Sequence, residues 1–232
     1  TSVTYYITLR HFRKLTLKTL SQINHKNPLL ILPFTSQIEK YMIKYMRSGD
    51  TMLKMKDILD EKDKRLRLVS KEVEFPLTEK DIENINLMEE YLVNSQIEEK
   101  AEEYDLRPGM GMAAVQIGVL KRYIVIVNET DDGFDSYILI NPKIISNSEE
   151  MIYVESGEGC LSVNRDVDGI VPRYARVTVE GYDMDGNKIK IRAREELAIA
   201  FQHEIDHLNG ILFVDKIDKN NPYKDIDKYR PI

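Results

Sequence analysis

Apolar residues recur at helical spacing among charged ones between Thr78 and Tyr104. The apolar positions are Ile82, Ile85, Met88, Leu92 and Ile97. Thr78 suits the N-cap of such a helix because its hydroxyl can accept from a free N–H of the first turn. Pro108 and Gly109 then break the pattern. The pattern therefore predicts one N-terminal amphipathic helix that packs one face on a core.

Three runs after this helix are rich in β-branched and aromatic residues, which is typical of strands. They are "YIVIVNE" from Tyr123, "SYILINPKII" from Ser136 and "MIYVES" from Met151. Farther along, "YARVTVEGYDMDGNKIKIRA" alternates apolar and polar residues on both sides of "MDGN". This alternation predicts a hairpin that turns at Asp185 and Gly186.

A second helix is predicted from Arg194 to Asn209, with Gly210 as its left-handed cap. Its apolar stripe consists of Leu197, Phe201, Ile205 and Leu208. The order of helix, mostly antiparallel strands and helix indicates an α+β fold. We therefore expect antiparallel sheets packed around a central C-terminal helix. The tail "DKIDKNNPYKDIDKYRPI" is compatible with a charged helix or a frayed end.

The first 38 residues contain no aspartate or glutamate, but carry several basic residues among many serines and threonines. This composition is typical of an organelle transit segment, and a basic surface arm is the alternative. We therefore divide the chain into a transit-like N-terminal extension, residues 1–56, and a folded domain, residues 57–232.

Charge and composition exclude several classes of protein. The net charge of −6 argues against a whole-domain surface for DNA. No apolar run approaches the roughly 18 residues of a membrane span. The single cysteine, Cys160, rules out an intramolecular disulfide and favours a reducing compartment.

The stretch "AFQHEIDHLNG" places His203 and His207 four residues apart, with Glu204 directly after the first. On a helix this HExxH spacing puts both imidazoles on one face, where they can bind one metal ion. The position of a metzincin-type third histidine is occupied by Phe213. A thermolysin-type ligand is missing too, because no glutamate follows Glu204 in the sequence.

Cys160 is the best remaining third ligand. It lies in "SGEGCLSVN", whose glycines and polar residues differ from the apolar flanks of a buried structural cysteine. One thiolate and two imidazoles leave a fourth tetrahedral position open for water, as in a catalytic site. Zinc and ferrous iron both suit this donor set. A cysteine nucleophile with a histidine base is the alternative, but it leaves the helical histidine pair unexplained.

The stretch "RPGMGMAAVQIG", residues 107–118, is rich in small residues. It is weak as a dinucleotide-binding fingerprint, because it follows a predicted helix and not a strand. Together, however, "GMGMAAVQ", "EGCLS" and "QHEIDHLNG" occur in the order of the three signature motifs of peptide deformylases. The chain from about Asp57 to Lys219 resembles that family, so residues 57–232 would be a deformylase-like metallohydrolase domain.

This resemblance implies a metal-dependent hydrolase that removes the formyl group from the N-terminal formyl-methionine of nascent polypeptides and releases formate. Glu204 would be the general acid/base beside the three metal ligands, and Gln116 with the N–H of Leu161 would form the oxyanion hole. Glu158 would be structural, with Arg173 as its ion-pair partner. Six residues match substrate-binding positions: Gly109, Met110, Gly111, Gly159, Ile199 and Ala200.

The resemblance also implies the cofactor and the partners. The family typically uses Fe²⁺, and Zn²⁺ or another divalent metal can replace it. The partners would be N-formylmethionyl nascent peptides and the ribosome exit region. The transit-like start resembles plastid-targeted members of malaria parasites. We therefore expect an organelle of bacterial ancestry, a plastid or apicoplast before a mitochondrion, with the cytoplasm as the alternative.

Two other function classes stay open at this point. A zinc endopeptidase of the HExxH class would explain the histidine pair, but not "EGCLS". A non-enzymatic metal-binding or ribosome-tethering module would explain the basic N-terminal segment, but it would need no Glu204.

Overall fold

The computed structural model describes residues 52–131 and 133–232, so the transit-like extension predicted for residues 1–56 lies almost entirely outside the described residues. Residues Leu53–Glu129 and Asp135–Ile232 form one compact unit. The elements below belong to this unit, apart from Thr130, Gly133 and Phe134 at two strand ends.

Three α-helices and five short 3-10 helices form in the described part of the chain. The α-helices are α3 (Glu79–Ser95), α4 (Glu98–Tyr104) and α5 (Glu195–Leu208). The 3-10 helices are η1 (Met55–Asp57), η2 (Lys64–Arg67), η3 (Ala114–Ile117), η4 (Phe213–Lys216) and η5 (Ile226–Lys228). Across residues 52–131 and 133–232, every helix is too short or too polar to be a membrane span.

The described strands form two sheets. The strands are β1 (Gly111–Ala113), β2 (Tyr123–Thr130), β3 (Gly133–Asn147), β4 (Met151–Tyr153), β5 (Arg173–Tyr174), β6 (Arg176–Tyr182), β7 (Lys188–Arg194) and β8 (Arg230–Pro231). The larger sheet has the order β1-β2-β3-β6-β7, and the smaller has the order β5-β4-β8. The pairs β1–β2, β3–β6, β6–β7 and β4–β5 are antiparallel, whereas β4 and β8 are parallel.

The predicted hairpin is β6–β7, which pairs without interruption from Arg176↔Arg194 to Tyr182↔Lys188. Gly186 lies in the turn with φ of 85°, a conformation that glycine adopts without a steric penalty. The hairpin prediction is confirmed, because the alternation and the turn chemistry are both local properties of the sequence.

The prediction of one continuous helix from Thr78 to Tyr104 is wrong. Helices α3 and α4 are separated by Gln96 and Ile97. The Gln96 side chain donates to the carbonyls of Gly109 and Val127, each at 3.0 Å. These bonds hold the end of α3 against carbonyls that lie 13 and 31 positions later in the chain. The local helical pattern of residues 78–104 contains no sign of them.

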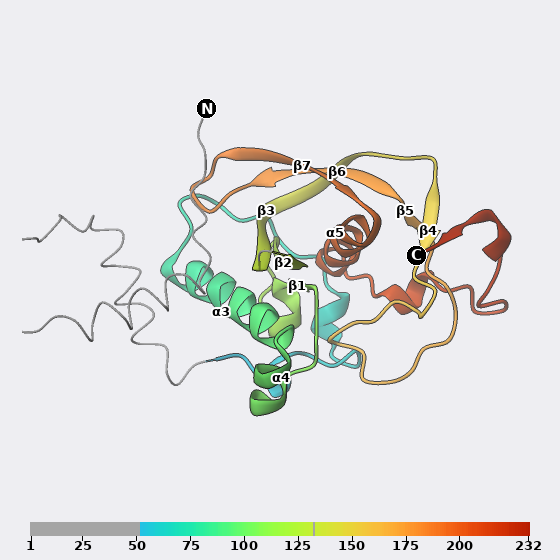
Figure 1. Ribbon diagram of the computed structural model, residues 1–232. Coiled ribbons are helices and arrows are strands. Elements are labelled where there is room, and N and C mark those ends of the chain that lie inside the picture. The colour runs from blue at the N-terminus through green and yellow to red at the C-terminus, as the bar shows by residue number, and fades with distance from the viewer. Residues whose placement is uncertain (1–51, 132) are drawn as a thin grey trace, which may run out of the picture. The chain divides into compact units, whose positions relative to one another are not determined.

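Helix α5 packs against strands β1, β5, β6 and β7, and in Figure 1 it passes beneath the β6–β7 hairpin. Phe201 and Leu208 of this helix are fully buried in the main core. Gly210, with φ of 75°, follows the helix in the left-handed conformation that was predicted for it. Packing on several sides therefore fixes the orientation of α5 and of the polar residues that it carries.

The α+β prediction is confirmed in its coarse form, since helices combine with mostly antiparallel sheets. The short strands β1, β5 and β8 were missed because two or three residues give no readable alternation. The tail contains η5 and then β8, which pairs with β4. β8 therefore depends on a tertiary contact, whereas the bonds of η5 are local.

Candidate metal centre

Three donor atoms meet where α5 passes the loop that follows β4. His203 and His207 lie one turn apart on α5, and Cys160 lies on the loop. The Cys160 Sγ is 3.2 Å from His207 Nε2, which is 3.1 Å from His203 Nε2. All three residues are buried, and one donor atom from each lies within 4.8 Å of the others.

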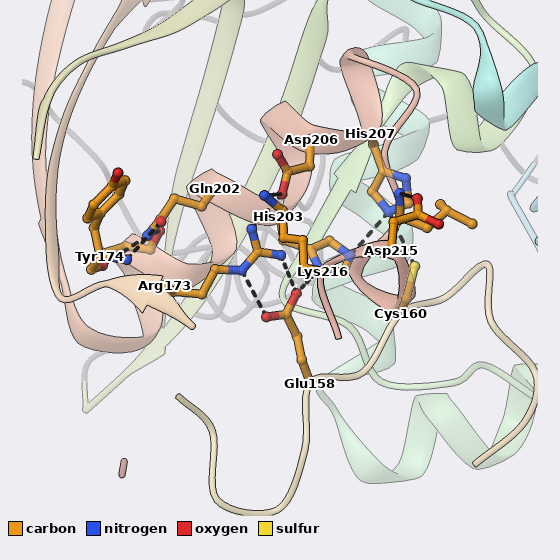
Figure 2. A network of polar contacts seen from close by, with 12 residues as sticks. Glu158, Cys160, Arg173, Tyr174, Gln202, His203, Asp206, His207, Asp215 and Lys216 are labelled. Carbon is orange, nitrogen blue, oxygen red and sulfur yellow. Dashed lines mark hydrogen bonds and ion pairs between the residues drawn. The ribbon is translucent and has the colours of Figure 1, made fainter. Parts of the chain in front are cut away.

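A carboxylate fixes the orientation of His203. Glu158 Oε1 lies 2.6 Å from His203 Nδ1, so the other ring nitrogen faces the remaining two donors. Arg173 donates to the same carboxylate at 3.0 and 2.6 Å and to Asp206 at 2.5 Å, as Figure 2 shows. The predicted ion pair between Glu158 and Arg173 is therefore confirmed.

This network sets the charge of its members. Burial by itself would raise the pKa of Glu158, but the hydrogen bonds from His203 and Arg173 outweigh burial and lower this pKa to about 2. Burial would lower the pKa of His203, but Cys160 and Glu158 raise it well above its ordinary value. Burial and the neighbouring His203 lower the pKa of His207 well below its usual range, which favours the neutral form that binds metals.

Glu204 lies on the same helix in a different environment. It is only 3% exposed, and its Oε2 has no hydrogen-bond partner within residues 52–131 and 133–232. Burial raises its pKa to about 7, so this carboxyl can gain or lose a proton near neutral pH. A Cβ at Gly111 would lie 2.5 Å from Glu204 Oε1, so β1 passes close to the carboxyl and only glycine leaves it room.

Gln116 faces the loop between β4 and β5, residues 154–172, which we call the cysteine loop. Gln116 Oε1 accepts from the Ala113 N–H at 2.8 Å, and its Nε2 lies 3.2 Å from Ser162 Oγ and 3.8 Å from Cys160 Sγ. The Leu161 N–H has no hydrogen-bond partner in the part of the chain that the structure describes. The structure thus brings two N–H donors, from Gln116 and Leu161, next to the thiol.

Three predicted substrate-binding residues lead into and begin β1. A Cβ at Gly109 would lie 2.9 Å from Leu161 Cδ1, so this residue packs against the cysteine loop. Met110 packs partly buried on the main core, and Gly111 lies against Glu204. The structure therefore brings residues 109–111 next to the Glu204 carboxyl and the cysteine loop.

The other three predicted substrate-binding residues lie apart from β1. Gly159 precedes the cysteine, and a Cβ built on it would have no atom within 4 Å, so the space beside it is open. Ile199 and Ala200 are buried on α5, one turn before His203. Ile199 packs with Ile152 in a small apolar cluster, whereas Ala200 belongs to the main core.

Sequence reasoning missed several contributors to the centre. Asp206 joins the charge network through Arg173, and Phe213 stacks on His203 with 6.2 Å between ring centroids. Arg107 donates to the carbonyl of Cys160. These residues reach the centre through tertiary contacts, for which the sequence has no local signal.

The donor set fits a divalent metal ion. A cysteine sulfur and two imidazoles converge, and the two Nε2 atoms lie 3.1 Å apart, where their lone pairs repel unless a proton or a cation lies between them. A soft thiolate combined with imidazole nitrogens suits Zn²⁺ or Fe²⁺. The hydrogen bond that the Nδ1–H of His203 donates to Glu158 is the support that metal-binding histidines usually have.

A protein-family model described as polypeptide deformylase matches residues 55–223. The chain belongs to the polypeptide deformylase family. A curated relative, peptide deformylase 2 of Bacillus anthracis, is 50% identical over 182 residues, which cover 78% of this chain and 99% of the relative. The resemblance seen in the three motifs is therefore confirmed.

Solved structures of deformylases resemble this one. A probable peptide deformylase from Synechococcus phage S-SSM7 is 37% identical with a TM-score of 0.56, covering 68% of this chain and 97% of that one. A Met-Ala-Ser-bound class I type b peptide deformylase from Acinetobacter baumannii is 27% identical with a TM-score of 0.57, covering 72% of this chain and 99% of that one.

The chain is thus a metal-dependent hydrolase that removes the N-terminal formyl group from nascent peptides. The predicted function is confirmed, and these matches give no support to the zinc endopeptidase.

Proposed function

We propose that Cys160, His203 and His207 hold the metal ion of this deformylase and that Glu204 moves the proton. The observation that carries the proposal is the convergence of three buried donor atoms within 4.8 Å. Two of them lie on α5, which also bears the buried Glu204 carboxyl with a pKa of about 7. In this proposal the HExxH motif of α5 supplies two of the three metal ligands and the base, and Cys160 is the third ligand.

When bound, the metal supplies a water acidic enough to ionise near neutral pH. Glu204 accepts a proton from the water that attacks the formyl carbon, and then delivers it to the leaving amine nitrogen as the C–N bond breaks. A carboxyl with a pKa of about 7 suits both steps, because its two protonation states have similar free energies at neutral pH.

Two N–H donors complete the chemistry. The amide of Gln116 and the N–H of Leu161 stabilise the negative oxygen that develops when water adds to the formyl group. Loss of one such donor typically costs about 100- to 1000-fold in rate. The missing partner of the Leu161 N–H supports this role.

The peptide would lie along Gly109, Met110 and Gly111, pairing with their backbone like an added strand, and would pass Gly159. Ile199 and Ala200 would line the pocket for the methionine side chain. The open space at Gly159 supports this path. The Met-Ala-Ser peptide in the structure of the Acinetobacter baumannii relative supports a methionine-first ligand.

The native metal in this proposal is Fe²⁺, with Zn²⁺ as a substitute. We also propose that residues 1–56 direct the enzyme to a plastid-type organelle, and that the enzyme acts near the ribosome exit. The acid-free composition of the first 38 residues supports the targeting proposal, and the family match begins only at residue 55. The nascent-chain substrate supports the ribosome proposal.

The test is formate release from formyl-Met-Ala-Ser by protein reconstituted anaerobically with Fe²⁺, with unformylated Met-Ala-Ser as a protease control. We expect formate from the first peptide and an intact control peptide. Cys160→Ser should lower both the bound metal and the formate release, because a neutral hydroxyl replaces a thiolate ligand. Unchanged metal content and turnover in this variant would remove Cys160 from the ligand set.

A further inference from the structure

Arg107 connects the stretch that enters β1 with the cysteine loop. Its Nη2 donates to the carbonyl of Cys160 and, at 3.1 Å, to the carbonyl of Val163. Its Nη1 donates to Asn164 Oδ1 at 2.7 Å. One planar guanidinium therefore holds three acceptors within residues 160–164 of the cysteine loop. This geometry suits arginine, and a lysine ammonium cannot reproduce it.

One of these acceptors shares a peptide unit with a proposed oxyanion donor. The carbonyl of Cys160 and the N–H of Leu161 belong to the same planar trans unit, so they point in opposite directions. Holding the carbonyl from one side therefore fixes the direction of the N–H on the other side. A cation at the carbonyl oxygen also polarises the peptide unit and makes its N–H a stronger donor.

The main chain of Arg107 is itself anchored. The Tyr91 hydroxyl donates to the Arg107 carbonyl at 3.0 Å, and Tyr91 is fully buried on α3. The segment that presents the guanidinium is thus held independently of the bonds that its side chain makes. A change of the side chain can therefore remove its three bonds to the loop while leaving the path of the main chain in place.

We propose that Arg107 is a positioning residue for deformylation. It aims the Leu161 N–H at the place where the oxyanion develops, and it strengthens that donor through the Cys160 carbonyl. This inference rests on the proposed role of the Leu161 N–H. The described hydrogen bonds of the Arg107 side chain go only to the loop, so it acts through the peptide unit and not on the substrate.

A purely structural tie would have different consequences. If Arg107 served only to hold the loop in the fold, its loss would lower thermal stability and metal content together. A role in aiming an oxyanion donor lowers kcat and leaves KM and metal content unchanged, because the donor acts only as charge develops in the transition state.

The test compares Arg107→Met with Arg165→Met in formate release from formyl-Met-Ala-Ser. Arg165 is a matched control because it lies on the same loop, is exposed, and among the described residues bonds only to Glu61, at 2.7 and 3.1 Å. For metal-loaded Arg107→Met we expect kcat to fall about 10- to 100-fold with KM and metal content near wild type. Arg165→Met should keep the wild-type kcat.

A second variant keeps the proposal testable if Arg107→Met does not fold. Arg107→Lys retains the charge but lacks the fork, so we expect a smaller fall in kcat and a shifted Leu161 amide resonance in the zinc-loaded protein. A wild-type kcat with an unshifted resonance would overturn the inference. So would an Arg107→Met variant that loses metal and stability in proportion to its activity.

The experiment distinguishes a failure of this inference from a failure of the proposed function. Formate release by the wild-type protein with an unimpaired Arg107→Met variant contradicts the role of Arg107 alone. No formate from the wild-type protein contradicts the proposed chemistry, and the Leu161 resonance in Arg107→Lys then still decides whether Arg107 sets that N–H.

Discussion

Two buried carboxyls beside α5 have opposite environments. Glu158 bonds to His203 and twice to Arg173, and its pKa is lowered to about 2. Glu204 has an oxygen without a partner among the described residues, and its pKa is raised to about 7. Burial acts in the same direction on both groups, so the neighbouring donors decide the difference.

The two environments suit two different roles, orienting a histidine and transferring a proton. A buried carboxylate that receives several hydrogen bonds stays ionised and can hold a histidine in one orientation. A buried carboxyl without such bonds keeps both protonation states accessible, which is what a proton-transfer group needs. In the proposed function, glutamate thus serves two different purposes within one site.

The largest expected effect is that of Glu204→Gln on activity. Turnover should fall about 100- to 10,000-fold, because an amide cannot carry the proton. Metal content should stay at the wild-type level, and thermal stability should not fall, since the substitution removes a charge that burial disfavours. Formate release, metal analysis and a thermal melt measure the three quantities. A variant that turns over normally would take Glu204 out of the reaction.

Glu158→Gln should instead lower stability and metal affinity. Loss of the Glu158 carboxylate leaves the buried Arg173 guanidinium, 2% exposed, with Asp206 as its remaining carboxylate. Breaking a buried pair in this way typically costs about 3–5 kcal/mol of unfolding free energy. Metal affinity should fall about 10- to 100-fold because His203 loses its orienting partner. Denaturant titration and metal titration measure these losses.

Glu150 offers the matched control for this prediction. It also bonds to two arginines, Arg176 and Arg230, each at 2.8 Å, but on the surface. Glu150→Gln should change stability little, because water screens exposed ion pairs. Equal losses in the two variants would mean that burial does not distinguish the two sites.

The pH dependence of stability should separate the two carboxyls in the metal-free protein. The folded pKa of Glu158 lies below the ordinary 4.5, so its stabilisation is present above pH 4.5 and is lost as the pH falls toward 2. The folded pKa of Glu204 lies above 4.5, so its stabilisation is present below pH 4.5 and is lost as the pH rises to about 7. Each contribution is about 3 kcal/mol.

The test is to measure the unfolding free energy of wild type and of each variant as a function of pH. At each pH, the value for the variant is subtracted from the value for wild type. The difference for Glu204→Gln should change between pH 4.5 and 7, and the difference for Glu158→Gln should change between pH 2 and 4.5. Flat difference curves in these windows would show that the two groups do not have opposite shifts.

The smallest expected effect is that of Gly111→Ala. The added Cβ would lie 2.5 Å from Glu204 Oε1, so the carboxyl must move. We expect kcat to fall about 10- to 100-fold, since displacement by about 1 Å is enough for such a loss. Gly159→Ala should keep kcat and change at most KM, because its Cβ would meet no atom within 4 Å. Steady-state kinetics of both variants decide this.

The sequence by itself determined the features that depend on near neighbours. The spacing of His203 and His207 puts both imidazoles on one helical face. The alternation around Gly186 defines the β6–β7 hairpin, and Gly210 ends α5. Each follows from interactions within a few residues, which a single sequence displays directly.

Only the tertiary structure decided which groups surround these features. Glu158 lies 45 residues before His203, yet their side chains meet at 2.6 Å. The break between α3 and α4 depends on Gln96 bonding to Gly109 and Val127. The difference between the two carboxyls depends likewise on burial and on donors from distant segments. A pKa is set by everything packed around a group, and the chain folds that environment together from residues that no local pattern connects.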